Sequence, residues 1–146
     1  MKKVLITFAL LAFAHTAFGA HHGGDEALTL EKRQADAVMT ITNVDLGDDI
    51  TTISAKGKMG EYGTVYVTYH LRYNADLKSG FVTGSGRGAV DADTVLAGAF
   101  NGIWTRDGSI VKIRELVQIS DGTQNLDVID IDMLKDTFVI KAYTLK

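Results

Sequence analysis

The chain has 146 residues, a formal net charge of −3 at pH 7, and neither Cys nor Pro. The absence of Cys excludes disulfides, thiolate metal sites and a Cys nucleophile. Because the charged residues form no basic cluster, nucleic acid is not an expected partner. A chain of this length buries enough surface to form one domain.

The N-terminus has the composition of a secretory signal peptide. Lys2 and Lys3 provide a positive start, residues 4–18 are almost entirely apolar, and the run closes on the small residue Gly19. A membrane anchor needs about 20 apolar residues, and this run is shorter. We therefore expect residues 1–19 to be cleaved, leaving an exported protein, periplasmic or extracellular, with a charge of −5 and no membrane span.

Two adjacent histidines follow the expected cleavage site. Cleavage after Gly19 would leave Ala20, His21 and His22 as the first three residues. The free amine, two backbone amides and the His22 imidazole then make a square-planar site that suits copper(II) or nickel(II). Cleavage after Ala20 instead puts His21 first, and a metal there would need another ligand. His21 and His22 are the candidate metal ligands, and no other cofactor is expected.

The segment 20–37 is predicted to be a flexible lead into the domain. It begins with a polar, Gly-containing stretch. Its second part, Ala27–Ala37, fits either two or three helical turns or a direct entry into the first strand.

From Val38 onward the hydrophobic period is two, which indicates β-strands rich in β-branched and aromatic residues. The breaks between them carry Gly, Asp and Asn, and each is too short for a parallel crossover. A sheet of eight successive antiparallel strands is stabilised most by closing into a barrel, because closure removes its exposed edges. We predict an all-β domain over residues 38–146, an eight-stranded antiparallel up-and-down barrel, with a two-sheet β-sandwich as the alternative. The expected strands are Val38–Leu46, Ile50–Met59, Thr64–Tyr73, Gly80–Val90, Thr94–Arg106, Ser109–Ile119, Leu126–Met133 and Thr137–Leu145.

One predicted strand is unusually rich in glycine. In Phe81–Val90 one face carries Gly84, Gly86 and Gly88 between two valines. Alternate glycines let a strand bend sharply or let a neighbour approach closely, which favours closure. A phosphate-binding loop would open a helix, and no helix is expected here.

Glu115 is the candidate catalytic residue, because it interrupts the apolar face of the strand Ser109–Ile119. A carboxylate on a core face is costly unless it is paired or protonated. The structural alternatives are an inward ion pair with Arg87 or Arg106, or a bulge that turns Glu115 outward.

Four other residues are candidates for ligand binding. The polar face of Thr64–Tyr73 includes Tyr66 and His70, which would line a cavity only if the barrel interior were wet. Trp104 lies beside small residues and either packs in the core or walls a ligand cavity. Arg87, in the glycine-rich strand, is the fourth candidate.

An acidic run lies near the C-terminus: Asp127, Asp130, Asp132 and Asp136. It lacks the central Gly of a helix-flanked calcium loop. We expect it to be a solvated outer face.

Two neighbouring stretches, Gly80–Gly88 and Gly98–Trp104, resemble the glycine-laced hairpin of small bacterial proteins with the allene oxide cyclase barrel. The resemblance covers the central third of the chain. It implies an eight-stranded antiparallel barrel with a mostly apolar cavity, used in some members for cyclisation or isomerisation. The plant cyclases use Cys and Pro in their pocket and this chain has neither, so no catalytic residue is carried over.

The sequence leaves several functions open. It contains no paired Ser/His/Asp set and no His-x-His or His-Glu-x-x-His spacing, so a secreted barrel that binds a small apolar or amphipathic molecule is favoured over an enzyme. The alternative is a cyclase or isomerase that uses Glu115 as its acid. A minimal outer-membrane barrel and a protein–protein module are the other two hypotheses. Oligomeric state is not predicted.

Overall fold

The computed structural model describes residues 30–145, which form nine strands and one short 3-10 helix. The eight long strands lie within two residues of their predicted bounds. The elements are β1 (Glu31–Lys32), β2 (Ala37–Leu46), β3 (Ile50–Lys58), η1 (Gly60–Tyr62), β4 (Thr64–Tyr73), β5 (Ser79–Ala89), β6 (Val95–Asp107), β7 (Ile110–Ile119), β8 (Gln124–Asp132) and β9 (Thr137–Thr144). The predicted signal peptide and the candidate metal ligands His21 and His22 lie outside the described residues.

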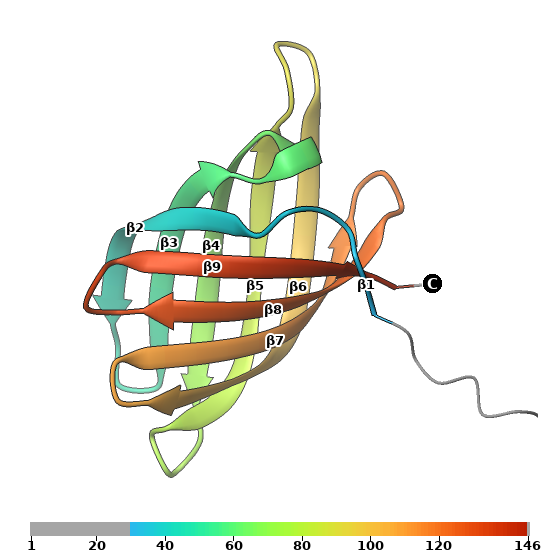
Figure 1. Cartoon of the computed structure of the whole chain (residues 1–146). Helices are drawn as coiled ribbons and strands as arrows, with labels where there is room; N and C mark the ends of the chain where they lie inside the picture. The colour runs from blue at the N-terminus through green and yellow to red at the C-terminus, as the bar shows by residue number, and fades with distance from the viewer. Residues whose placement is uncertain (1–29, 146) are drawn as a thin grey trace, which may run out of the picture.

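Strands β2 to β9 form a closed antiparallel barrel. Each strand pairs with the next in the chain, and β9 closes the ring by pairing with both β8 and β2. In Figure 1, β3 to β6 run roughly vertically, and β7 to β9 cross them roughly horizontally. The predicted eight-stranded barrel is therefore confirmed, and the strands do not separate into the alternative two-sheet sandwich.

The short strand β1 lies outside this ring. It pairs with the last two residues of β9, beyond the point where β2 pairs with the same strand. The segment that leads into the barrel contains this strand and, over residues 30–37, no helical turn. Further on, a register shift between Ile41 and Asn43 bends β2 away from β9.

The barrel interior is built from alternate residues of each strand. In β4, for example, Val65, Val67 and Tyr69 are buried, while Tyr66 and His70 face outward. This is the assignment that a period of two predicts for a strand with one apolar face. No helix within residues 30–145 is long and apolar enough to cross a membrane.

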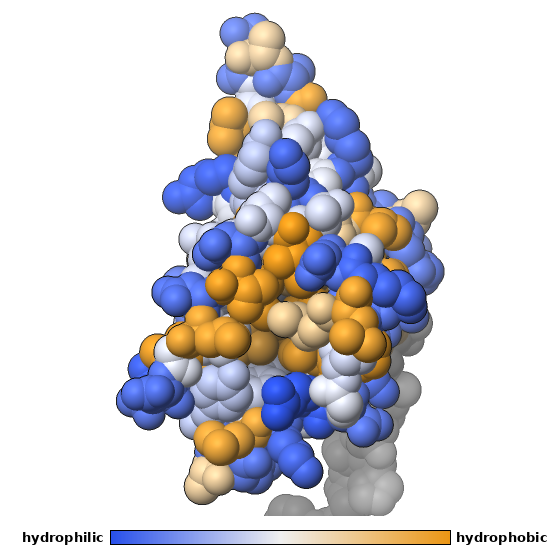
Figure 2. Space-filling view, turned by 90° about the vertical axis from the view of Figure 1, so that its left-hand side faces the viewer, coloured by the Kyte–Doolittle hydropathy of each residue, from blue (hydrophilic) through white to orange (hydrophobic). Residues whose placement is uncertain are grey.

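Exposed apolar side chains gather at one end of the barrel. Figure 2 shows an apolar area in the middle of the face on the left of Figure 1. The β2–β3 and β8–β9 turns lie on this side, and they hold the exposed side chains of Leu46 and Leu134. The cavity described below lies at the other end, beside η1 and the β7–β8 turn.

Candidate functional site

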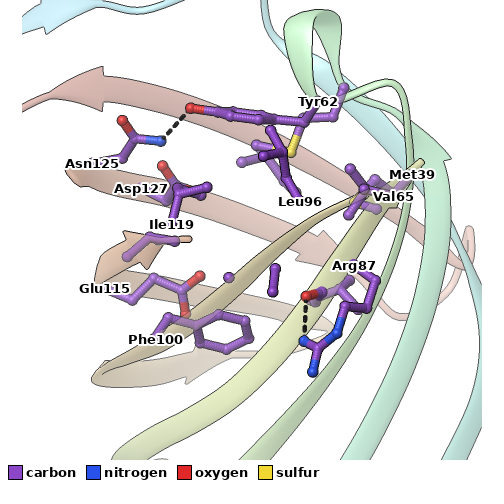
Figure 3. Close-up of a pocket in the computed structure, with 18 of the residues that line it drawn as sticks. Met39, Tyr62, Val65, Arg87, Leu96, Phe100, Glu115, Ile119, Asn125 and Asp127 are labelled. Atoms are coloured by element: carbon purple, nitrogen blue, oxygen red, sulfur yellow. Dashed lines mark hydrogen bonds between the residues drawn. The ribbon is translucent and has the colours of Figure 1, made fainter. Parts of the chain in front are cut away.

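A cavity enters the barrel at the end that holds η1 and the β7–β8 turn (Figure 3). The volume of the cavity is about 60 Å³. This is more room than one water molecule needs. The wall is mainly apolar, with contributions from Met39, Met59, Val65, Leu96, Phe100 and Ile119.

Two facing glycines leave this space open. Gly86 of β5 and Gly98 of β6 are direct partners in the antiparallel ladder, and both line the cavity. A Cβ added at Gly98 would meet its nearest neighbour, Ile119, at 3.6 Å, which is ordinary van der Waals contact. By contrast, a Cβ at Gly84 would lie 2.4 Å from the Phe100 ring. Gly84 thus makes room for a ring, whereas Gly86 and Gly98 lie side by side in the cavity wall and add no side chain to it.

Two carboxyl groups project into the cavity from neighbouring strands. Glu115 of β7 and Asp127 of β8 are direct ladder partners, so their side chains leave the sheet side by side on its inner face. The side chains are 2% and 4% exposed, respectively. Figure 3 shows both of them pointing into the hollow. Each has one buried oxygen, Oε2 of Glu115 and Oδ1 of Asp127, without a hydrogen-bond partner.

Burial keeps these carboxyl groups protonated to unusually high pH. It raises the pKa of Glu115 from 4.5 to about 9, with repulsion from Asp127 adding to the shift and a hydrogen bond from Tyr69 opposing it. Burial also raises the pKa of Asp127, from 3.8 to about 7, against the attraction of the Arg33 charge. At neutral pH the pair therefore holds between one and two protons.

A chain of polar contacts closes one side of the cavity mouth. Asn125 donates through Nδ2 to the Tyr62 hydroxyl at 3.1 Å and accepts a hydrogen bond from Arg33 Nε at 2.5 Å. Arg33 also pairs with Glu61 at 3.4 Å. Because Arg33 lies between β1 and β2, this chain fastens the N-terminal segment to η1 and to the start of β8.

Of the sequence-predicted site residues, Glu115 lies in the cavity. It is inward-facing on a regular strand, so the bulge alternative is wrong. Among residues 30–145, no ion pair joins it to Arg87 or Arg106, the partners proposed from sequence.

The other candidates lie elsewhere. Tyr66 and His70 are on the outer face, where His70 contacts the Thr52 hydroxyl at 3.1 Å. Arg87 borders the cavity through its position on β5, but its exposed side chain turns outward and donates to the Gly86 carbonyl at 2.8 Å. Tyr66 and Arg87 are ladder partners and line a shallow outer hollow, not the interior.

Trp104 is buried toward the opposite end of the barrel. Its Nε1 donates to the Arg72 carbonyl at 3.0 Å, and its ring meets Tyr73 edge-on. Trp104 is not among the residues that line the cavity. Within the described part of the chain, no three His, Asp or Glu side chains come together as a metal site, and the copper site at His21 and His22 stays a prediction.

The sequence interpretation placed Asp127 wrongly. It was grouped with Asp130 and Asp132 as part of a solvated outer face, but the structure buries it. The alternation of β8 predicts the burial of Asp127, because Asp127 lies on the same face of the strand as the buried Ile129 and Ile131.

Comparison of the chain with protein-family models, with curated proteins and with solved structures found no match. The class of molecule therefore rests on fold and site alone: a closed eight-stranded antiparallel barrel with an apolar cavity and an inward pair of carboxyl groups.

Proposed function

We propose that the protein is an exported barrel that binds a small amphipathic molecule in its interior cavity. The observation that carries the proposal is the cavity lined by Gly86 and Gly98, whose wall also includes the two carboxyl groups. Ligand sites are typically apolar hollows with a few convergent polar groups, and this cavity has that composition. The signal peptide predicted from residues 1–19 supports export, and the resemblance to the allene oxide cyclase barrel supports an interior site.

The proposal can be tested by filling the cavity without disturbing the backbone. At Gly98 the Cβ has room, so Gly98→Leu should place its side chain in the hollow. Ala99→Leu is the matched control, because it adds a leucine to the same strand at an exposed outer position. Hexan-1-ol is titrated into each protein, and the methyl signals of the wall residues are followed by NMR.

The wild type and Ala99→Leu should bind hexan-1-ol with equal affinity, and Gly98→Leu should bind it at least about tenfold more weakly because the ligand's volume is occupied. Equal shifts of the wall methyls in all three proteins would refute the proposal. Circular dichroism of the three proteins establishes that Gly98→Leu is folded.

A second function is favoured by one specific observation, the burial of the Glu115 carboxyl group in the cavity wall, which raises its pKa to about 9. A carboxylic acid that faces a cavity can donate its proton to a bound molecule, as general acid catalysis requires. This supports the alternative of a cyclase or isomerase, the activity implied by the resemblance. In such a reaction Glu115 would give its proton to an epoxide or enol oxygen of the substrate, and Asp127 would be the neighbouring base.

Glu115→Gln separates catalysis from binding, because glutamine still donates a hydrogen bond but has no acidic proton. A panel of small unsaturated epoxides is followed by NMR with the wild type and the variant. For a cyclase or isomerase, conversion should fall by a factor of about 100 or more while hexan-1-ol binding is retained. No conversion above the uncatalysed rate by the wild type would argue against this function and leave the binding proposal standing.

A further inference from the structure

When its carboxyl pair is ionised, the cavity offers more hydrogen-bond acceptors than donors. The Asn125 amide donates to Tyr62, and the Arg33 guanidinium is engaged by Asn125 and Glu61. These donors are therefore used at the mouth, whereas Glu115 Oε2 and Asp127 Oδ1 have no partner deeper in the cavity. A buried acceptor without a partner destabilises the folded protein. A ligand that supplies donors at this point would relieve this destabilisation.

The placement of the two carboxyl groups suits one shared donor group. As direct partners on one face of an antiparallel pair, Glu115 and Asp127 have Cβ atoms about 5 Å apart. A primary ammonium group carries three donors and one charge, so it can bond to both carboxylates at once. A hydroxyl group has one donor, and a ligand carboxylate has none.

Few other charges act on this position. Tyr69 of β4 bonds to Glu115, Tyr62 of η1 bonds to Asn125, and Arg33 lies beyond Asn125 at the mouth with Glu61. In β2, β3, β5, β6 and β9 the described residues that face the interior are uncharged, and most of them are glycine or apolar. No cation in these strands competes for the carboxyl pair, and the wall around it is apolar.

We propose that the ligand of the cavity is an amphipathic primary amine, with its ammonium group between Glu115 and Asp127 and its hydrocarbon part against the apolar wall. This inference rests on the proposed binding function and names its ligand class. Anionic ligands would place a negative charge beside two carboxyl groups and are disfavoured.

Binding of the amine is coupled to proton release. The ammonium group pairs with ionised carboxylate, so a carboxylic acid of the pair loses its proton to solvent as the ligand enters, and the amine keeps its own. The affinity should therefore fall by about tenfold for each pH unit below 7, where Asp127 is protonated in the free protein. It should level off above pH 7, where Asp127 is already ionised in the free protein.

The test compares three ligands of one size: hexylamine, hexan-1-ol and hexanoate. Affinities are measured by calorimetry at pH 8 and pH 6, in buffers of different ionisation enthalpy so that released protons are counted. We expect hexylamine to bind at least tenfold more tightly than hexan-1-ol at pH 8, to release about one proton on binding at pH 6 and much less at pH 8, and hexanoate to bind most weakly.

Two variants and a control locate the effect. Glu115→Gln and Asp127→Asn remove the charges at nearly constant shape, and each should reduce the preference for hexylamine over hexan-1-ol by about tenfold or more. Asp130→Asn makes the same chemical change on the outer side of β8 and should leave the preference unaltered.

The outcomes separate the two proposals. Equal affinities for amine and alcohol, or a preference that survives Glu115→Gln and Asp127→Asn, would overturn the amine inference and leave the binding function intact. No binding of any of the three ligands by the wild type would overturn both.

Discussion

The β5–β6 pair places glycine on the inner face at both ends, with opposite results. At one end Gly80 faces Trp104, and a Cβ at Gly80 would lie 2.9 Å from the Trp104 Nε1. Toward the other end the ladder pairs Gly86 with Gly98, and neither residue adds a side chain to the cavity that both line. Gly80 therefore makes room for the Trp104 ring, whereas Gly86 and Gly98 leave space that no side chain of the described residues fills.

The difference divides the barrel by role. The filled end gains stability from burial of Trp104 and from its edge contact with Tyr73. The open end forgoes that burial and instead holds Glu115 and Asp127, two groups that are costly to bury in their charged form. Unfilled space together with buried ionisable groups is the combination expected of a site and not of a core.

The largest effect should come from emptying the filled end. Trp104→Ala removes a 2% exposed ring and its hydrogen bond to the Arg72 carbonyl. The free energy of unfolding, measured by urea denaturation, should fall by about 3–5 kcal/mol. A loss below about 1 kcal/mol would mean that this end is not the packed half of the barrel.

The next effect concerns the carboxyl pair at the open end. The pKa values of Glu115 and Asp127 in the folded protein, about 9 and about 7, lie above their ordinary values of 4.5 and 3.8. The folded protein therefore binds these protons more tightly than the unfolded chain does. Their contribution to stability is fully present below about pH 4 and is lost as the pH rises through 7 for Asp127 and 9 for Glu115.

Between pH 6 and pH 8 the free energy of unfolding should fall by about 4 kcal/mol, since each group contributes up to about 1.4 kcal/mol per pH unit and the contribution of Asp127 fades above pH 7. The double variant Glu115→Gln/Asp127→Asn should lose most of this dependence and be more stable than the wild type at pH 8. Urea denaturation across this pH range measures both slopes, and parallel curves for the two proteins would contradict the assignment.

The smallest effect compares the glycines directly. Gly80→Ala brings a Cβ to 1.8 Å from the Arg72 carbonyl oxygen, so the strand must shift, at a cost of about 1–3 kcal/mol. Gly98→Ala meets no close contact and should change stability by less than about 1 kcal/mol. Thermal melts of the two variants measure the contrast; equal losses would show that the space beside Gly98 is not open.

Much of the fold follows from the sequence, because its causes are local. Alternation of apolar residues predicts the strands, and the short turns force antiparallel neighbours and closure. The inward position of Glu115 follows from the same alternation within β7. The short strand β1 carries no such signal, since two residues show no periodicity.

The site was less predictable, because it depends on register between strands. Whether a glycine faces Trp104 or another glycine is decided by how β5 pairs with β6, and composition does not report it. Alternation within β8 predicts that Asp127 faces inward, but the acidic residues on the other face of β8 obscure this pattern in the sequence. Tyr66 and His70 were candidates only if the interior were wet, and the apolar face of β4 lies inside instead.

The central claim is that the space beside Gly98 holds a small molecule. The most direct test is native mass spectrometry of the protein purified from its own host, as wild type, Gly98→Leu and Ala99→Leu. The wild type and Ala99→Leu should carry a noncovalent mass excess of one small molecule, and Gly98→Leu should have the mass of the bare chain. A bare chain in the wild type, or the same excess in all three proteins, would contradict the account.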